Sequence, residues 1–208
     1  MNLFDHEKEK YNIVHKFTGT SKDQVGYGRQ INELRTSDNE FHKLWRAAFS
    51  TGKSFLEIGI GSGEILYYFE DNSMPYCGID ISDHIVLELA SSGLNVRHMS
   101  CNKMEFGDNE FEVVQHLDGL EHVPIKWEQD TLSETVRVSS KYIFHANAMG
   151  EAYLDEISKK HGYDNVHVNI KNEEEWSNFY VRNKDDLGYD IIHSEVISNT
   201  YYIVLEKR

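Results

Sequence analysis

The residues Leu56-Glu57-Ile58-Gly59-Ile60-Gly61-Ser62-Gly63 stand between a strand pattern and a helix pattern. SFLEI (54–58) has the composition of a short buried strand, and EILYYFED (64–71) that of a helix. Glycines between a strand and a helix let the backbone turn tightly and approach a ligand closely, and the start of the helix offers unpaired N–H groups. The stretch therefore predicts a binding loop for a nucleotide-like ligand at the end of the strand.

The spacing of the glycines distinguishes two classes of ligand. Dinucleotide sites use G-x-G-x-x-G, whose third glycine allows close packing of the helix that receives the pyrophosphate. In this chain the glycines stand at positions 59, 61 and 63, and position 64 is Glu, whose carboxylate repels a pyrophosphate. Glu57 suits a ligand with a cationic part instead. An NAD(P)-dependent oxidoreductase is therefore kept as the weaker alternative.

Downstream of this loop, strand and helix patterns alternate. Further strands are expected at 75–80, 94–100, 111–117 and 141–148, with helices at 82–93 and about 126–138. This alternation is typical of a parallel sheet with helices on both faces. After a helix at 173–183, the strands 189–197 and 200–207 are joined only by Ser198-Asn199, which requires an antiparallel pair. The sequence thus predicts an α/β fold: a doubly wound, seven-stranded, mostly parallel sheet with a C-terminal antiparallel hairpin.

Two segments lie outside this pattern. Residues 1–50 are expected to form a helical arm or cap on the main body, 51–208, with a loop at 19–30 and a helix at 41–49 that Ser37 or Asp38 caps. Residues 149–171 match no element and are expected to form an insertion near the carboxyl edge of the sheet.

Composition excludes several classes of protein. Of the 208 residues, 21 are Lys or Arg and 35 are Asp or Glu, a net charge of −14 that disfavours nucleic acid as a partner. The sequence holds no signal peptide and no membrane-spanning run, and Cys77 and Cys101 match no zinc or disulfide framework. We therefore expect one soluble cytoplasmic domain with no membrane partner. A homodimer is left open.

Four stretches, in order, resemble the class I S-adenosylmethionine (SAM)-dependent methyltransferases. They are LEIGIGSG (56–63), GIDIS (78–82), MEFGDNEFEVV (104–114) and DGLEHVP (118–124). The first is similar to the glycine motif E/D-x-G-x-G-x-G of that family, and the last to its LEHVP segment after the fourth strand. The resemblance covers about 54–208 and implies the methyltransferase fold, with SAM as the cofactor.

The resemblance also implies a set of cofactor-binding residues. Asp80 is expected to hold the ribose hydroxyls, and Ile81 to pack on the adenine. Where the family often has an Asp after the third strand, this chain has Ser100-Cys101-Asn102, so the Asn102 oxygen and the Cys101 N–H are expected to serve the adenine. The cofactor-binding residues that we predict are Glu57, Gly59, Gly61, Gly63, Asp80, Ile81, Cys101, Asn102 and His116, with Tyr27 and Arg29 from the arm. Tyr11 is a further candidate in the arm.

For catalysis we select His122, Asp118 and His145, which follow or lie on the strands whose ends face the acceptor. Each has a structural alternative: His122 as a framework residue, Asp118 as a turn cap, and His145 packed in the sheet. A divalent metal held by Asp118 with His116, His122 or His145 is the weaker alternative. No metal site is predicted, because no ligand spacing is fixed.

The predicted function is SAM-dependent methyl transfer to a small-molecule or saccharide acceptor, on oxygen. The alternatives are a catalytically silent SAM-binding module and, more weakly, the oxidoreductase.

Overall fold

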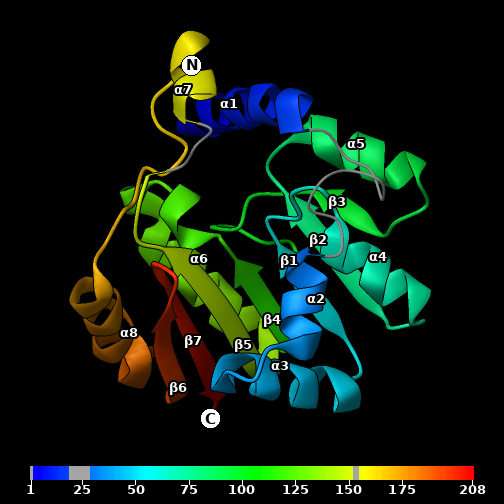
Figure 1. Cartoon of the computed structure of the whole chain (residues 1–208), viewed down its shortest axis with the longest axis vertical. Helices are drawn as coiled ribbons and strands as arrows, with labels where there is room; N and C mark the ends of the chain where they lie inside the picture. Colours follow the sequence, from blue (N-terminus) through cyan, green and yellow to red (C-terminus); the bar gives the residue numbers. More distant parts are fainter. Residues whose placement is uncertain (1, 19–28, 152–154) are drawn as a thin grey trace.

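The computed structural model describes residues 2–18, 29–151 and 155–208, with side chains for 2–16, 32–151 and 155–208. Seven strands in these ranges form one sheet of order β3-β2-β1-β4-β5-β7-β6 (Figure 1). The strands are β1 (Phe55–Ile58), β2 (Tyr76–Asp80), β3 (Val96–His98), β4 (Phe111–Leu117), β5 (Ser139–Ala148), β6 (Tyr189–Ile197) and β7 (Thr200–Lys207). β1 to β5 pair in parallel, and β7 is antiparallel to both β5 and β6. The predicted sheet is confirmed.

Helices cover both faces of the sheet, as the strand pattern requires. One hydrophobic cluster joins the sheet to α3, α4 and α5, and the other joins it to α6 and α8. Successive side chains of a strand point to opposite faces, so Phe55 belongs to the first cluster and Leu56 to the second. The helices are α1 (Leu3–Thr18), α2 (Arg29–Thr36), α3 (Glu40–Thr51), α4 (Glu64–Asp71), α5 (Asp83–Ser91), η1 (Leu120–His122), α6 (Ile125–Val138), α7 (Asp155–Lys160) and α8 (Glu173–Leu187).

Side chains next to the first turn cap three of the helices. Ser82 caps α5 by accepting from the Ile85 N–H, and Asn172 forms a capping box with Glu175 at the start of α8. The predicted caps of α3, Ser37 and Asp38, are wrong: Asn39 accepts from the His42 N–H. Ser37, Asp38 and Asn39 are all residue types that can cap a helix. The helix begins at Glu40, with its buried face starting at Phe41, so Asn39 occupies the cap position.

The loop and insertion predictions need correction in part. Most of the predicted loop, 19–28, lies outside the described residues, but its last two residues belong to α2, which begins at Arg29. The insertion 149–171 contains a short helix, α7, that was not predicted. Within the described ranges, no helix is long and apolar enough to cross a membrane.

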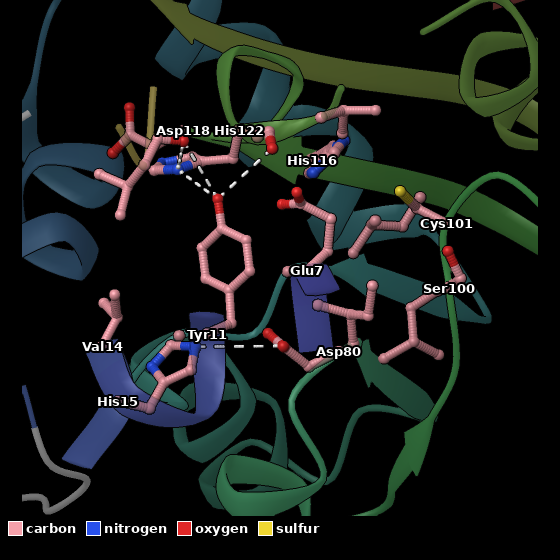
Figure 2. A pocket seen from close by; sticks show the side chains of 18 of the residues that line it. Glu7, Tyr11, Val14, His15, Asp80, Ser100, Cys101, His116, Asp118 and His122 are labelled. Carbon is pink, nitrogen blue, oxygen red and sulfur yellow. Dashed lines mark hydrogen bonds and ion pairs between the residues drawn. The ribbon is translucent and has the colours of Figure 1, made fainter. Parts of the chain in front are cut away.

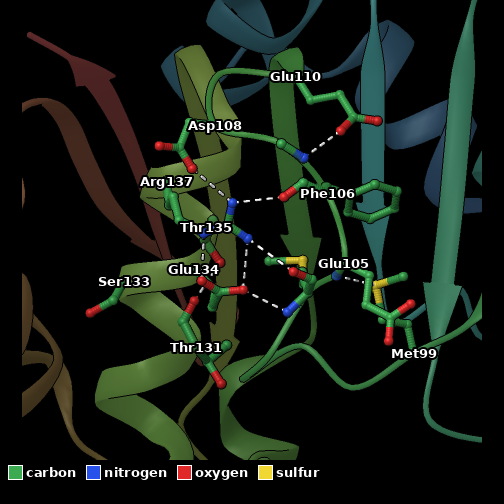
Figure 3. A network of polar contacts seen from close by, with 12 residues as sticks. Met99, Glu105, Phe106, Asp108, Glu110, Thr131, Ser133, Glu134, Thr135 and Arg137 are labelled. Atoms are coloured by element: carbon green, nitrogen blue, oxygen red, sulfur yellow. Dashed lines mark hydrogen bonds and ion pairs between the residues drawn. The ribbon is translucent and has the colours of Figure 1, made fainter.

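The segment between β3 and β4, which carries the third family-like stretch, is held by one guanidinium (Figure 3). Arg137 of α6 donates to the Phe106 and Met104 carbonyl oxygens at 2.7 and 3.0 Å. It also pairs with Asp108 at 2.9 Å and with Glu134 at 2.6 Å. The planar five-donor fork of Arg suits this many acceptors and fixes the path of the chain toward β4.

Candidate active site

A cavity of about 390 Å³ lies at the carboxyl ends of β1, β2 and β4, where open parallel sheets bind ligands (Figure 2). Helix α1 forms its opposite wall. Glu7, Tyr11, Val14 and His15 of α1 line it, together with Gly59, Gly61, Glu64, Asp80, Ile81, Ser100, Cys101, His116, Asp118, His122, Trp127 and Val166, among others. The cavity therefore lies between the predicted binding loop and the first helix of the chain.

The glycine loop has the backbone that its sequence predicts. Gly59, Gly61 and Gly63 have φ of 73°, 48° and 78°, a region that residues with a Cβ rarely adopt. Gly59 and Gly61 line the cavity. Gly63 is the residue directly before α4, and a Cβ at this position would lie 2.7 Å from the Leu89 side chain of α5. The first two glycines thus bring the backbone to the ligand, and the third allows α4 and α5 to pack closely.

Asp80 and Ile81 both line the cavity at the end of β2. Oδ1 of Asp80 accepts from the Ser82 N–H at 2.9 Å, which fixes the carboxylate at the entrance to α5. Cys101 lines the cavity near them, and burial raises the pKa of its thiol to about 11, so the thiol stays protonated. Among the described residues, Asn102 does not belong to the lining, and its side-chain oxygen accepts from the Ser100 hydroxyl.

Glu57 is buried, and side chains of distant elements surround its carboxylate. Its carboxylate accepts from Nε2 of Gln115 at 2.7 Å, and Oε1 of Gln115 accepts from the Trp45 indole at 2.8 Å. Burial raises the pKa of Glu57 to about 8, which favours the protonated acid at neutral pH. In this structure Glu57 ties β1 to β4 and α3, and it is not part of the described lining.

Three of the predicted residues, His116 near the end of β4 and Asp118 and His122 after it, all line the cavity. Asp118 has a φ of 50°, which turns the chain sharply at the end of the strand. Loss of hydration lowers the pKa of His122 to about 3 and that of His116 well below its usual range, so both rings are neutral. Each neutral ring has one nitrogen that donates a hydrogen bond and one that accepts.

His145 lies elsewhere. It is fully buried on β5, and its Nδ1 is 2.8 Å from the Tyr180 hydroxyl of α8. Its ring is 5.9 Å from that of His116, and His145 is not in the described lining of the cavity. Of the two predicted arm residues, Tyr27 lies outside the described residues, and the side chain of Arg29 does as well.

Helix α1 supplies the residues that the sequence analysis largely missed. The Tyr11 hydroxyl lies 3.1 Å from His122 Nδ1, and His15 Nε2 lies 4.0 Å from Asp80 Oδ1 (Figure 2). Asn12 accepts from the Ser82 hydroxyl at 2.7 Å and docks α1 on the start of α5. Glu7, Tyr11, Val14 and His15 follow the i, i+4, i+7, i+8 pattern of one helical face, which is the signal that could have identified them.

Comparisons with known proteins agree with this arrangement. The family model described as "Methyltransferase domain" matches residues 56–141. Magnesium protoporphyrin IX methyltransferase from Synechocystis, solved with bound SAH, has a TM-score of 0.65 and 14% identity, covering 99% of this chain and 98% of that chain. A SAM-dependent methyltransferase from Archaeoglobus fulgidus has a TM-score of 0.62 and 17% identity, covering 95% and 99%. The comparison with curated protein sequences gives no match.

A third structure is a chain of the complex between the Haloferax volcanii Trm112 methyltransferase activator and a methyltransferase. Its TM-score is 0.63 and its identity 14%, covering 99% of this chain and 97% of that chain. The Synechocystis enzyme has also been solved with SAM bound. The family match over residues 56–141 and the strand order together show a methyltransferase domain with the fold of the SAM-dependent methyltransferases, of which the Synechocystis enzyme binds SAM and SAH.

Proposed function

We propose that this methyltransferase acts on a hydroxyl group of a small molecule or saccharide. The carrying observation is the cavity itself: at about 390 Å³ it is near the small end of the range for ligand pockets, ~300–1,000 Å³, and α1 closes one side of it. Glu7, Glu64, Asp80 and Asp118 line it, and the net charge is −14, so a phosphate-rich acceptor is disfavoured.

The described residues fit SAM. The backbone at Gly59 and Gly61 is open to the cavity, and the Asp80 carboxylate supplies hydrogen-bond acceptors for ribose hydroxyls. Ile81 and Cys101 offer an apolar and a neutral surface where the adenine is proposed to lie. SAM supplies a methyl group that is already activated by its sulfonium, so the protein mainly has to position the acceptor.

His122 is the proposed base for an acceptor hydroxyl. It lines the cavity, and Tyr11 of α1 contacts its Nδ1. Asp118 is proposed to orient the acceptor from the same wall. We further propose that the part of residues 1–50 that acts as a cap is α1, because α3 packs its Trp45 and Phe49 into the sheet core.

The test is methyl transfer from methyl-labelled SAM to a panel of sugars, phenols, carboxylates and amines, with the product identified by mass spectrometry. We expect label on a hydroxyl-bearing acceptor, and loss of the signal in His122→Ala with SAM binding kept. Label on nitrogen or on protein only would overturn the O-methylation proposal. SAM binding without transfer to any acceptor would favour the silent SAM-binding module.

A partner protein is a second candidate for the source of specificity. It is favoured only by the similarity to the complex that contains the Trm112 activator. Size-exclusion chromatography with multi-angle light scattering would show whether the isolated chain is a monomer or a homodimer. Full activity of that isolated species would remove the need for a partner.

A further inference from the structure

A group of ligand-type side chains lies beside the cavity, which His122 of this group lines, apart from the proposed cofactor residues. Glu121, His122 and His167 each offer one nitrogen or oxygen atom, and these three atoms lie within 4.8 Å of one another. Glu121 and His122 come from η1, directly after β4, and His167 comes from the insertion 149–171. Residues that are more than 40 positions apart in the chain thus converge at one point.

The hydrogen bonds of the two histidines leave the same nitrogen available on each ring. Nδ1 of His122 is 3.2 Å from the Val166 carbonyl oxygen, and Nδ1 of His167 is 2.5 Å from that of Gly150. A carbonyl oxygen can only accept, so Nδ1 carries the proton and Nε2 carries the lone pair. Tyr11 does not compete, because its hydroxyl can donate to the Val166 oxygen at 3.2 Å. Metal-binding histidines typically donate their second N–H to a carbonyl in this way.

Glu121 adds a carboxylate that is only half satisfied. The side chain has no exposed surface, and its Oε1 accepts from the Ala148 N–H at 2.8 Å. Its Oε2 is buried with no hydrogen-bond partner among the described residues. A buried carboxylate oxygen without a partner is costly, and a cation beside it would remove that cost.

The backbone holds these ligands together. The carbonyl oxygen of Glu121 accepts from the N–H groups of Val168 and Asn169, at 2.9 and 3.0 Å. These two bonds clamp the segment that carries His167 onto η1. The two imidazole rings lie 4.5 Å apart, between centroids, at 80°. The position of His167 is therefore set by the fold and not by a loose side chain.

We propose that Glu121, His122 and His167 bind one divalent transition-metal ion beside the cavity that His122 lines. Two imidazoles and a carboxylate suit Zn²⁺, Co²⁺ or Fe²⁺ better than Mg²⁺ or Ca²⁺, which prefer oxygen ligands. Binding of the ion does not depend on the proposed function. One consequence does: an acceptor hydroxyl that reached the ion would lose its proton more readily, and His122 would then be a ligand and not a base.

A second group, His6, Glu7 and Asp164, also has ligand atoms close together, but it already contains a cation. Nζ of Lys10 lies 2.7 Å from Glu7 and 3.1 Å from Asp164. An ammonium in this position neutralises the carboxylates and excludes a metal ion. This group therefore serves as the internal control for the proposed site.

The experiment is titration of the metal-stripped full chain with Co²⁺, followed by visible absorption, with competition by Zn²⁺ and by Mg²⁺. We expect one Co²⁺ per chain, a d–d band that Zn²⁺ removes, and no effect of Mg²⁺. His167→Ala and Glu121→Gln should each weaken Co²⁺ binding at least about tenfold, and His6→Ala should not. His167→Gln provides a second test should His167→Ala fold poorly, as judged by circular dichroism.

Three results would overturn the site: no stoichiometric Co²⁺ binding, binding that His167→Ala and His167→Gln leave unchanged, or binding that His6→Ala abolishes. Calorimetric titration with SAM in the same variants separates this proposal from the proposed function. SAM binding that persists while Co²⁺ binding is lost assigns the defect to the metal ligands alone.

Discussion

The two sides of the cavity are built in different ways. On the proposed cofactor side, most lining residues lie at or just after the ends of the adjacent strands β1 and β2, within the short runs 58–62 and 79–81. The opposite wall combines α1, the turn after β4 and the insertion, joined by contacts such as Tyr11 with His122, 111 positions apart. The first side is a property of local sequence, whereas the second exists only after the chain has folded.

This difference indicates where variation in function can occur. A loop whose glycines have left-handed φ angles tolerates few substitutions, since each added Cβ strains the backbone. The opposite wall depends on side chains from three separate elements, and each can change without disturbing the glycine loop. The acceptor and its chemistry are therefore expected to be set on the side of α1 and η1.

Of the variants considered, Gly119→Ala should have the largest effect, because it disturbs the turn after β4 in the wall opposite the glycine loop. A Cβ at Gly119 would lie 1.9 Å from Cδ2 of His116, so the ring or the turn has to move. Overpacking of this kind typically costs about 1–3 kcal/mol. Chemical denaturation and turnover measure the effect, with Gly107→Ala as the control, because a Cβ there meets only Glu110 at 3.5 Å. Equal losses in the two variants would contradict the prediction.

Asp80→Ala should disable the cofactor side while leaving the fold intact. Hydrogen bonds to a charged carboxylate contribute about 1.5–3 kcal/mol each, so we expect SAM affinity to fall by roughly 10- to 150-fold. Calorimetric titration with SAM and SAH provides the measurement. Asp130→Ala, which removes an exposed carboxylate of α6, is the control. An unchanged affinity in Asp80→Ala would mean that the ribose lies elsewhere.

Glu57→Gln should change the pH dependence of stability more than the activity. Burial raises the folded-state pKa of Glu57 from 4.5 to about 8, so between these values the folded chain holds a proton that the unfolded chain has lost. The free energy of unfolding therefore falls as pH rises through this window, by up to about 1.4 kcal/mol per pH unit.

Removing the acid should remove that slope. Denaturant titrations at pH 5, 6, 7 and 8 should show Glu57→Gln gaining stability relative to the wild type as pH rises. Glu9→Gln, an exposed position on α1, should run parallel to the wild type. If Glu57→Gln also runs parallel, the acid is ionised in the folded protein.

Tyr11→Phe should have the smallest effect, about 1 kcal/mol, because it removes one hydroxyl from the wall and keeps the ring. The hydroxyl contacts His122 Nδ1 and the Val166 carbonyl oxygen, at 3.1 and 3.2 Å. Hydrogen exchange of α1 should become faster, and turnover should fall more than SAM affinity. Unchanged exchange together with unchanged turnover would show that Tyr11 does not hold α1 in place.

The sequence predicted the sheet, and it also singled out several residues that line the cavity, such as Gly59, Gly61 and Asp80, because these signals are local. Glycine positions, the apolar strands, and caps such as Ser82 and Asn172 depend only on near neighbours. Glu57 faces inward because Gln115 and Trp45 accommodate it from distant elements, which no local pattern reveals. His167 likewise gains its neighbours only through the clamp on Glu121. Hydrogen bonds between distant segments thus mark the limit of what the sequence alone could predict.

The distribution of tryptophans gives this enzyme a built-in optical probe. Trp45 and Trp176 are 1% and 0% exposed and pack in the two clusters of the sheet, whereas Trp127 lines the cavity. Of the three tryptophans in the chain, the two buried ones should keep a constant fluorescence. The fluorescence of Trp127 should change when a ligand displaces water beside its ring. Fluorescence of the unlabelled protein, with Trp127→Phe as the blank, should therefore follow cofactor and acceptor binding in real time.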